Sequence, residues 1–162
     1  MTKALVLYYS LEGNVNFAAE TLAGELGADL FRVRTVKEYP AKGFAKFFHG
    51  GKDAVFSATP ELKEALPDFS PYDTIVLGAP VWAGKPAAPM NTILANADFT
   101  GKKIAVFVSS AGGNGESSIK IISEKAKNAS KVIAALSLKN PGAHQEESKE
   151  QIKTFAEKIK LG

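Results

Sequence analysis

The sequence predicts a doubly wound α/β domain in which helices cover both faces of a parallel, five-stranded sheet. Apolar runs alternate along the chain with segments whose apolar residues recur at helical spacing, and this alternation occurs five times. The apolar runs lack the polar alternation of half-exposed strands, as expected where both faces of a sheet are covered. Strands and helices in alternation imply parallel pairing through right-handed crossovers.

The predicted elements begin with a strand over Ala4–Tyr9. A helix follows, because apolar residues recur at helical spacing from Val15 until Gly27 ends the stripe. The remaining predicted elements are, in chain order, strand Leu30–Val33, strand Thr74–Leu77, a helix around Pro89–Ala95, strand Ile104–Val108, helix Ser117–Lys127, strand Val132–Leu138 and a helix from about Glu146 to Leu161.

The segment Tyr39–Pro67 is too long for a simple crossover loop. Its apolar side chains recur at helical spacing, at Phe44, Phe47, Phe48 and Val55. This spacing favours a second crossover helix that buries the phenylalanines against the sheet. The alternative is a partly exposed aromatic lip beside the ligand site.

Length and composition favour one domain spanning residues 1–162, because 45% of its 162 residues are hydrophobic. The chain has no cysteine, which excludes disulfides, thiolate metal sites and a cysteine nucleophile. Any redox chemistry would therefore come from a bound cofactor. The two histidines, His49 and His144, lie far apart, so we expect no metal site.

The net charge of +3 is unevenly distributed, with 8 basic and 10 acidic side chains in residues 1–80 and 12 and 7 in residues 81–162. The basic residues are spread singly along predicted helices, whereas a nucleic-acid footprint would cluster them. No apolar run approaches the length that spans a membrane, and the first run is too short for a signal peptide. We therefore expect a cytoplasmic protein without nucleic-acid or membrane partners.

Three loops of unusual composition follow the first, third and fourth predicted strands. Ligands of open parallel sheets bind beyond the carboxyl ends of the strands, so these loops are the candidate site. The first loop combines a hydroxyl, a glycine and the N-terminus of a helix, which together could cradle an anion. An ordinary strand-to-helix turn capped by Asn14 is an equal alternative. This loop comprises Ser10, Leu11, Glu12, Gly13, Asn14 and Val15.

The second loop, Gly78–Pro86, contains Trp82, the only tryptophan of the chain. Its prolines restrict the backbone and its glycines allow close approach, which favours a platform for a planar ligand over a core position for the tryptophan. The third loop offers backbone N–H groups with little side-chain bulk, and a flexible turn before the next helix is its alternative. It comprises Ser109, Ser110, Ala111, Gly112, Gly113, Asn114, Gly115, Glu116 and Ser117.

These loops resemble those of the flavodoxin family. Tyr8–Asn14 resembles the phosphate loop of flavodoxins, and Tyr72–Gly84 resembles their third strand and isoalloxazine loop. Gly43–Gly51 and the glycine-rich run Ser110–Gly115 are similar to one bacterial subgroup of flavodoxin-like proteins. The resemblance covers essentially the whole chain. It implies a flavodoxin-like sheet of order 2-1-3-4-5, with helices on both faces, and FMN as the cofactor.

The resemblance also implies roles for the residues of the three loops. The six residues of the first loop, from Ser10 to Val15, would hold the FMN phosphate. Trp82 would stack on the isoalloxazine ring or shield its edge, within a wall formed by Pro80, Val81, Trp82, Ala83 and Gly84. The pyrimidine side of the ring would meet Ser110, Ala111, Gly112, Gly113, Asn114 and Gly115. FMN would supply the electrons and the protein would tune their potential.

Two departures from the family pattern bear on function. Glu12 and Val15 replace the usual hydroxyl residues, which removes two donors and places a carboxylate near a dianion. We therefore hypothesise weakened but retained FMN binding. The third loop lacks the aromatic that usually sandwiches the ring, which leaves one ring face open unless a phenylalanine of the long insert covers it.

The resulting interpretation is an FMN-binding flavodoxin-like electron carrier that serves redox partner proteins. The alternative enzyme is an FMN or quinone reductase dependent on NAD(P)H, favoured by the open ring face and the positive charge. A flavodoxin-fold interaction module that has lost FMN is the third hypothesis, kept by Glu12 and Val15.

Overall fold

The computed structural model describes residues 3–40, 58–126, 128–129 and 131–162. The predicted helix around Phe44–Phe48, and with it the aromatic-lip alternative, lies outside the described residues. Residues 58–67 of the same insert contain no helix, and Thr35 pairs with Leu62 in an isolated antiparallel bridge. The elements are, in order, β1 (Ala4–Tyr8), α1 (Asn14–Leu26), β2 (Asp29–Arg32), β3 (Thr74–Trp82), β4 (Lys85–Pro86), α3 (Ala88–Asn96), β5 (Lys103–Ser110), α4 (Glu116–Lys125), β6 (Lys131–Lys139) and α5 (Gln145–Leu161).

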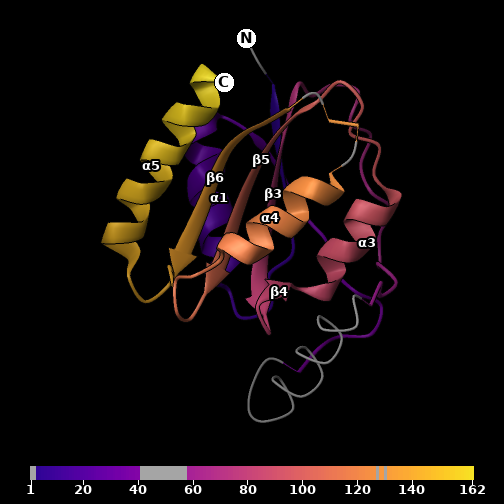
Figure 1. Cartoon of the computed structure of the whole chain (residues 1–162), viewed down its shortest axis with the longest axis horizontal. Coiled ribbons are helices and arrows are strands. Elements are labelled where there is room, and N and C mark those ends of the chain that lie inside the picture. Colours follow the sequence, from indigo (N-terminus) through magenta and orange to yellow (C-terminus); the bar gives the residue numbers. More distant parts are fainter. Residues whose placement is uncertain (1–2, 41–57, 127, 130) are drawn as a thin grey trace.

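The sheet has the order β2-β1-β3-β5-β6, with every pair along this path parallel. These five strands are the five predicted ones, and their order confirms the flavodoxin-like arrangement 2-1-3-4-5. The short strand β4 was not predicted and pairs antiparallel with the end of β3. The carboxyl ends of the strands, drawn as arrowheads, lie at the side of the sheet where β4 is found (Figure 1).

The third strand is longer than the predicted Thr74–Leu77. Its parallel pairing with β5 continues to Pro80 opposite Ser109, and its last residues, Val81 and Trp82, pair back onto β4. Most of the second predicted loop is therefore strand, and its turn is confined to Ala83 and Gly84. Backbone hydrogen bonding outweighs the loop-like composition, because Pro80 lacks only the N–H donor and its carbonyl still accepts from Ala87 at 2.9 Å.

Helices cover both faces of the sheet (Figure 1), and an apolar core lies between the sheet and the helices on each face. On one face, α1 and α5 pack against Val6, Val76 and Phe107. On the other, Met90 of α3 and Ile122 of α4 join Leu7, Leu77 and Val106 in the second core. The edge strands β2 and β6 are more exposed than the central strands β1, β3 and β5. Among the described residues, no helix is long and apolar enough to cross a membrane.

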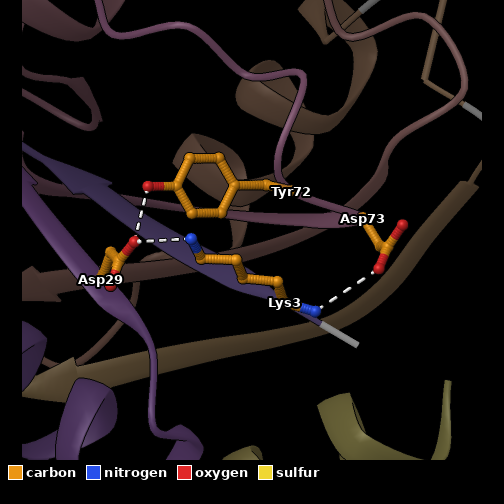
Figure 2. A network of polar contacts seen from close by, with 4 residues as sticks. All are labelled: Lys3, Asp29, Tyr72 and Asp73. Carbon is orange, nitrogen blue, oxygen red and sulfur yellow. Dashed lines mark hydrogen bonds and ion pairs between the residues drawn. The ribbon is translucent and has the colours of Figure 1, made fainter. Parts of the chain in front are cut away.

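A polar network joins the amino ends of β1, β2 and β3 (Figure 2). The Tyr72 hydroxyl donates to Asp29 Oδ2 at 2.7 Å, and Lys3 Nζ lies 3.5 Å from the same oxygen. The Lys3 ammonium also lies 5.1 Å from the centre of the Tyr72 ring, and the Lys3 N–H donates to Asp73 at 3.4 Å. These groups pair with one another through hydrogen bonds and charge, at the edge of the sheet opposite to the three loops.

Candidate functional site

A cavity of about 450 Å³ opens at the carboxyl edge of the sheet. Its volume lies within the range of about 300–1,000 Å³ that small-molecule sites occupy. All three predicted loops contribute to it. The lining residues are Ser10, Leu11, Glu12, Asn14, Val15, Pro80, Val81, Trp82, Ala83, Ser109, Ser110, Ala111 and Asn140.

The first loop delivers unpaired N–H groups to this cavity. Gly13 has φ +103°, a left-handed conformation that suits glycine, and α1 begins at the next residue. Ser10 Oγ accepts the N–H of Asn16 at 3.1 Å, and the carbonyl of Gly13 accepts that of Phe17 at 2.9 Å. Within the described part of the chain, the N–H groups of Asn14 and Val15 have no acceptor. They are therefore left to bind an anion at the helix N-terminus.

A fourth loop, between β6 and α5, completes this end of the cavity. Asn14 Oδ1 accepts the N–H of Gly142 at 3.0 Å, which ties the first loop to the fourth. The N–H of Asn140 donates to the Ser110 carbonyl at 3.1 Å, which ties the fourth loop to the third. Sequence reasoning missed Asn140. The usable signal was its place at the carboxyl end of the fifth predicted strand, together with the turn preference of Asn-Pro.

The second loop is a tight β-hairpin that presents Trp82. Its two turn residues, Ala83 with φ +50° and Gly84 with φ +77°, have the positive φ angles of a two-residue hairpin turn. The Trp82 ring meets the Tyr9 ring edge-on at 5.8 Å between centroids and the Tyr39 ring at 4.9 Å. Trp82 is thus half-buried in the cavity wall, with two tyrosines behind it.

Burial raises the pKa of Tyr9 to about 12, although the positive charge of Arg32 acts in the opposite direction. The phenol beneath Trp82 is therefore neutral at physiological pH and adds no charge to the aromatic wall. Of the lining residues that the structure describes, Glu12 alone is charged, and it is exposed to solvent.

The third loop divides into a part that faces the cavity and a part that does not. Ser110 and Ala111 line the cavity, and Ser110 Oγ is buried without a hydrogen-bond partner in the part of the chain that the structure describes. The segment Gly113–Gly115 is bound to Ser137 of β6. The Ser137 Oγ accepts the N–H of Gly115 at 2.8 Å and donates to the Gly113 carbonyl at 2.9 Å. A Cβ at Gly115 would lie 2.3 Å from Val108, so this close approach requires glycine.

The structure thus brings together the residues predicted in all three loops, with some exceptions. The predicted residues outside the lining are Gly13, Gly84, Gly112, Gly113, Asn114 and Gly115. Ser109, which belongs to the third predicted loop but was not expected to meet the ligand, lines the cavity, and so does Asn140, which was not predicted at all. The donors and walls fit a ligand that has an anionic group at one end and a flat polar ring at the other. A buried hydroxyl without a protein partner can bind a ligand or a water molecule.

The comparisons with known proteins agree with this geometry. The family model described as Flavodoxin matches residues 3–159. The flavoprotein of Lactobacillus acidophilus NCFM, solved in complex with FMN, is similar at 25% identity and a TM-score of 0.68, over 90% of this chain and 98% of that one.

Two further solved structures show the same similarity. The apo-form of the Lactobacillus acidophilus NCFM flavoprotein is 29% identical, with a TM-score of 0.65 over 85% of this chain and 93% of that one. Oxidised flavodoxin 2 of Bacillus cereus shares the fold at 22% identity, with a TM-score of 0.62 over 99% of both chains. The family match spans nearly the whole sequence, and the chain therefore belongs to the flavodoxin family.

Proposed function

We propose that this flavodoxin binds FMN in the cavity at the carboxyl edge and works as a cytoplasmic electron carrier for redox partner proteins. Family membership supports FMN as the cofactor, and so does the similar Lactobacillus acidophilus flavoprotein, which was crystallised with it. The observation that carries the proposal is the arrangement of unpaired donors. The N–H groups of Asn14 and Val15 lie at one end of the cavity, and the buried Ser110 hydroxyl lies in a wall of the same cavity as Trp82.

Each wall of the cavity has a role in holding the cofactor. The N–H groups of Asn14 and Val15 bind the phosphate, aided by the positive end of the α1 dipole. Trp82 and the hairpin turn flank the isoalloxazine ring and exclude water from it. The Ser110 hydroxyl donates a hydrogen bond to a polar atom of the ring and so regains the partner it lacks. FMN supplies the redox chemistry when it is bound.

An FMN titration of the apoprotein, followed by quenching of flavin fluorescence, tests the proposed binding. We expect saturable binding that weakens in Ser110→Ala, because this variant removes the orphaned hydroxyl from the cavity. Ser117→Ala changes an exposed serine in the first turn of α4 and is the matched control. No saturable binding at high micromolar FMN would refute the cofactor proposal.

A second experiment separates the carrier from an oxidoreductase that uses NAD(P)H. The FMN-loaded protein is mixed with NADPH without oxygen, and its flavin absorbance is followed. A carrier keeps its oxidised spectrum over seconds and takes up its two electrons at well-separated potentials in a spectroelectrochemical titration. Bleaching within seconds would assign the chain to the reductases instead.

A further inference from the structure

We propose that Arg32, which lies outside all three loops, positions the phosphate loop and makes the site selective for a phosphorylated flavin. This inference rests on the proposed binding of FMN. It assigns a role to a residue of the edge strand β2 that does not line the cavity.

The described residues that line the cavity offer a phosphate no basic side chain. Among the described residues that line it, Glu12 is the only charged one and there is no lysine or arginine. A bound phosphate carries about two negative charges near neutral pH, so the Glu12 carboxylate acts against it. The N–H groups of Asn14 and Val15 supply partial positive charge only. A full positive charge placed behind the cavity wall would therefore strengthen phosphate binding at this loop.

Arg32 is placed to supply that charge. Its Nη2 donates to the Ser10 carbonyl oxygen at 3.0 Å, so the guanidinium is joined directly to the first residue of the loop. Ser10 is 5% exposed and is also held by its hydroxyl, which accepts the N–H of Asn16 in α1. These two bonds hold Ser10 between β2 and α1, and with it the loop that leads to the unpaired N–H groups.

The strand pairing brings Arg32 to this place. Arg32 pairs with Tyr8, two residues before Ser10, and the N–H of Val33 donates to the Tyr8 carbonyl at 2.8 Å. Behind the loop lies a second cavity of about 380 Å³, which shares Ser10 and Leu11 with the first. Arg32 and Arg34 both line this second cavity. The first loop thus lies between the first cavity and the cavity that Arg32 and Arg34 line, and Arg32 donates a hydrogen bond to this loop.

The test compares FMN with riboflavin, which has the same ring and no phosphate. The ratio of their dissociation constants isolates the contribution of the phosphate. We expect Arg32→Gln to weaken FMN binding about tenfold and to leave riboflavin binding within about twofold. Arg34→Gln removes the same charge two residues away and is the matched control. We expect it to change the ratio of the two dissociation constants clearly less than Arg32→Gln does. Arg32→Lys keeps the charge without the planar fork and should fall between.

A double variant identifies the charge that Arg32 offsets. Adding Glu12→Gln to Arg32→Gln removes the opposing carboxylate and should restore part of the lost FMN selectivity. Thermal unfolding of each apoprotein confirms folding, which the exposed position of Arg32 favours.

Three results would overturn the inference while leaving FMN binding intact. They are an unchanged ratio in Arg32→Gln with equal losses of affinity for both flavins, an unchanged ratio in Arg32→Gln with no loss for either flavin, and an equal change of the ratio in Arg32→Gln and Arg34→Gln. If the unsubstituted chain binds neither flavin, the proposed function itself fails.

Discussion

The two edges of the sheet differ in whether their polar groups have partners within the protein. At the amino edge, the side chains of Asp29, Tyr72 and Lys3 satisfy one another (Figure 2). At the carboxyl edge, the Ser110 hydroxyl and the N–H groups of Asn14 and Val15 face a cavity without protein partners among the described residues. Because buried polar groups are nearly always paired in folded proteins, unpaired ones mark the edge where a ligand binds.

The topology explains this difference. Each parallel strand ends at the carboxyl edge and leads to a helix or a turn there, so helix N-termini with free N–H groups gather at that edge. Helix C-termini return to the amino edge, where they expose carbonyl groups. The protein's own cations reach carbonyls there, because Lys103 Nζ donates to the Gly162 carbonyl, just past α5, at 2.8 Å. The protein's own side chains thus pair with polar groups at the amino edge, whereas the N–H groups at the carboxyl edge remain for an anionic ligand.

Trp82→Ala gives the largest expected effect and tests the carboxyl edge. It removes the flat wall of the cavity, and aromatic stacking on a planar ligand is worth about 1–3 kcal/mol, or roughly 5- to 150-fold in affinity. The change should appear in the FMN dissociation constant measured by fluorescence. Trp82→Phe keeps an aromatic ring against Tyr9 and Tyr39 and should lose much less affinity. Equal losses in both variants would show that Trp82 does not stack on the flavin.

Asn14→Ala breaks the connection between the first and fourth loops. It removes the oxygen that accepts the Gly142 N–H at 3.0 Å, a bond worth about 0.5–1.5 kcal/mol. We expect FMN affinity to fall about tenfold, measured by titration, because the loop loses its fixed conformation. Asn96→Ala, which removes a single side-chain bond at the end of α3, is the control. A loss of stability with unchanged FMN affinity would place Asn14 with the structural polar groups.

The sheet and the loops at its carboxyl edge could be predicted from the sequence, because periodicity and loop composition are local properties. The alternation of strands and helices predicted a parallel, doubly wound sheet, the resemblance to flavodoxins implied its strand order, and the glycine-rich loops marked the carboxyl edge. Asn140 was missed because its place in the wall depends on the pairing of Ser110 with the fourth loop. Gly113 and Gly115 were predicted to meet the ligand; neither lines the cavity, and the Gly115 N–H and the Gly113 carbonyl are both bonded to the Ser137 hydroxyl of β6. Contacts between distant segments decide such details.

Raising the pH tests the aromatic support beneath Trp82. Burial raises the pKa of Tyr9 from its ordinary value of 10.0 to about 12, so the folded state keeps a proton that the unfolded state loses. This contribution to stability is complete below pH 10 and is lost as the pH rises to 12, at no more than about 1.4 kcal/mol per pH unit. Denaturant unfolding across this range measures the loss. Tyr9→Phe should show a shallower decline, and an equal decline would assign it to other groups.

Asp29→Asn gives the smallest expected effect and tests the amino edge. The hydrogen bond from Tyr72, with the nearby Lys3 charge, lowers the pKa of Asp29 below its ordinary value of 3.8. Its ionised form thus stabilises the fold above pH 3.8, and this contribution is lost as the pH falls through the lowered pKa. Unfolding by denaturant should show a slightly less stable variant at neutral pH and no difference in strong acid. FMN affinity should not change, because the network lies at the other edge of the sheet; a weakened affinity would show that the two edges are coupled through β1 and β2.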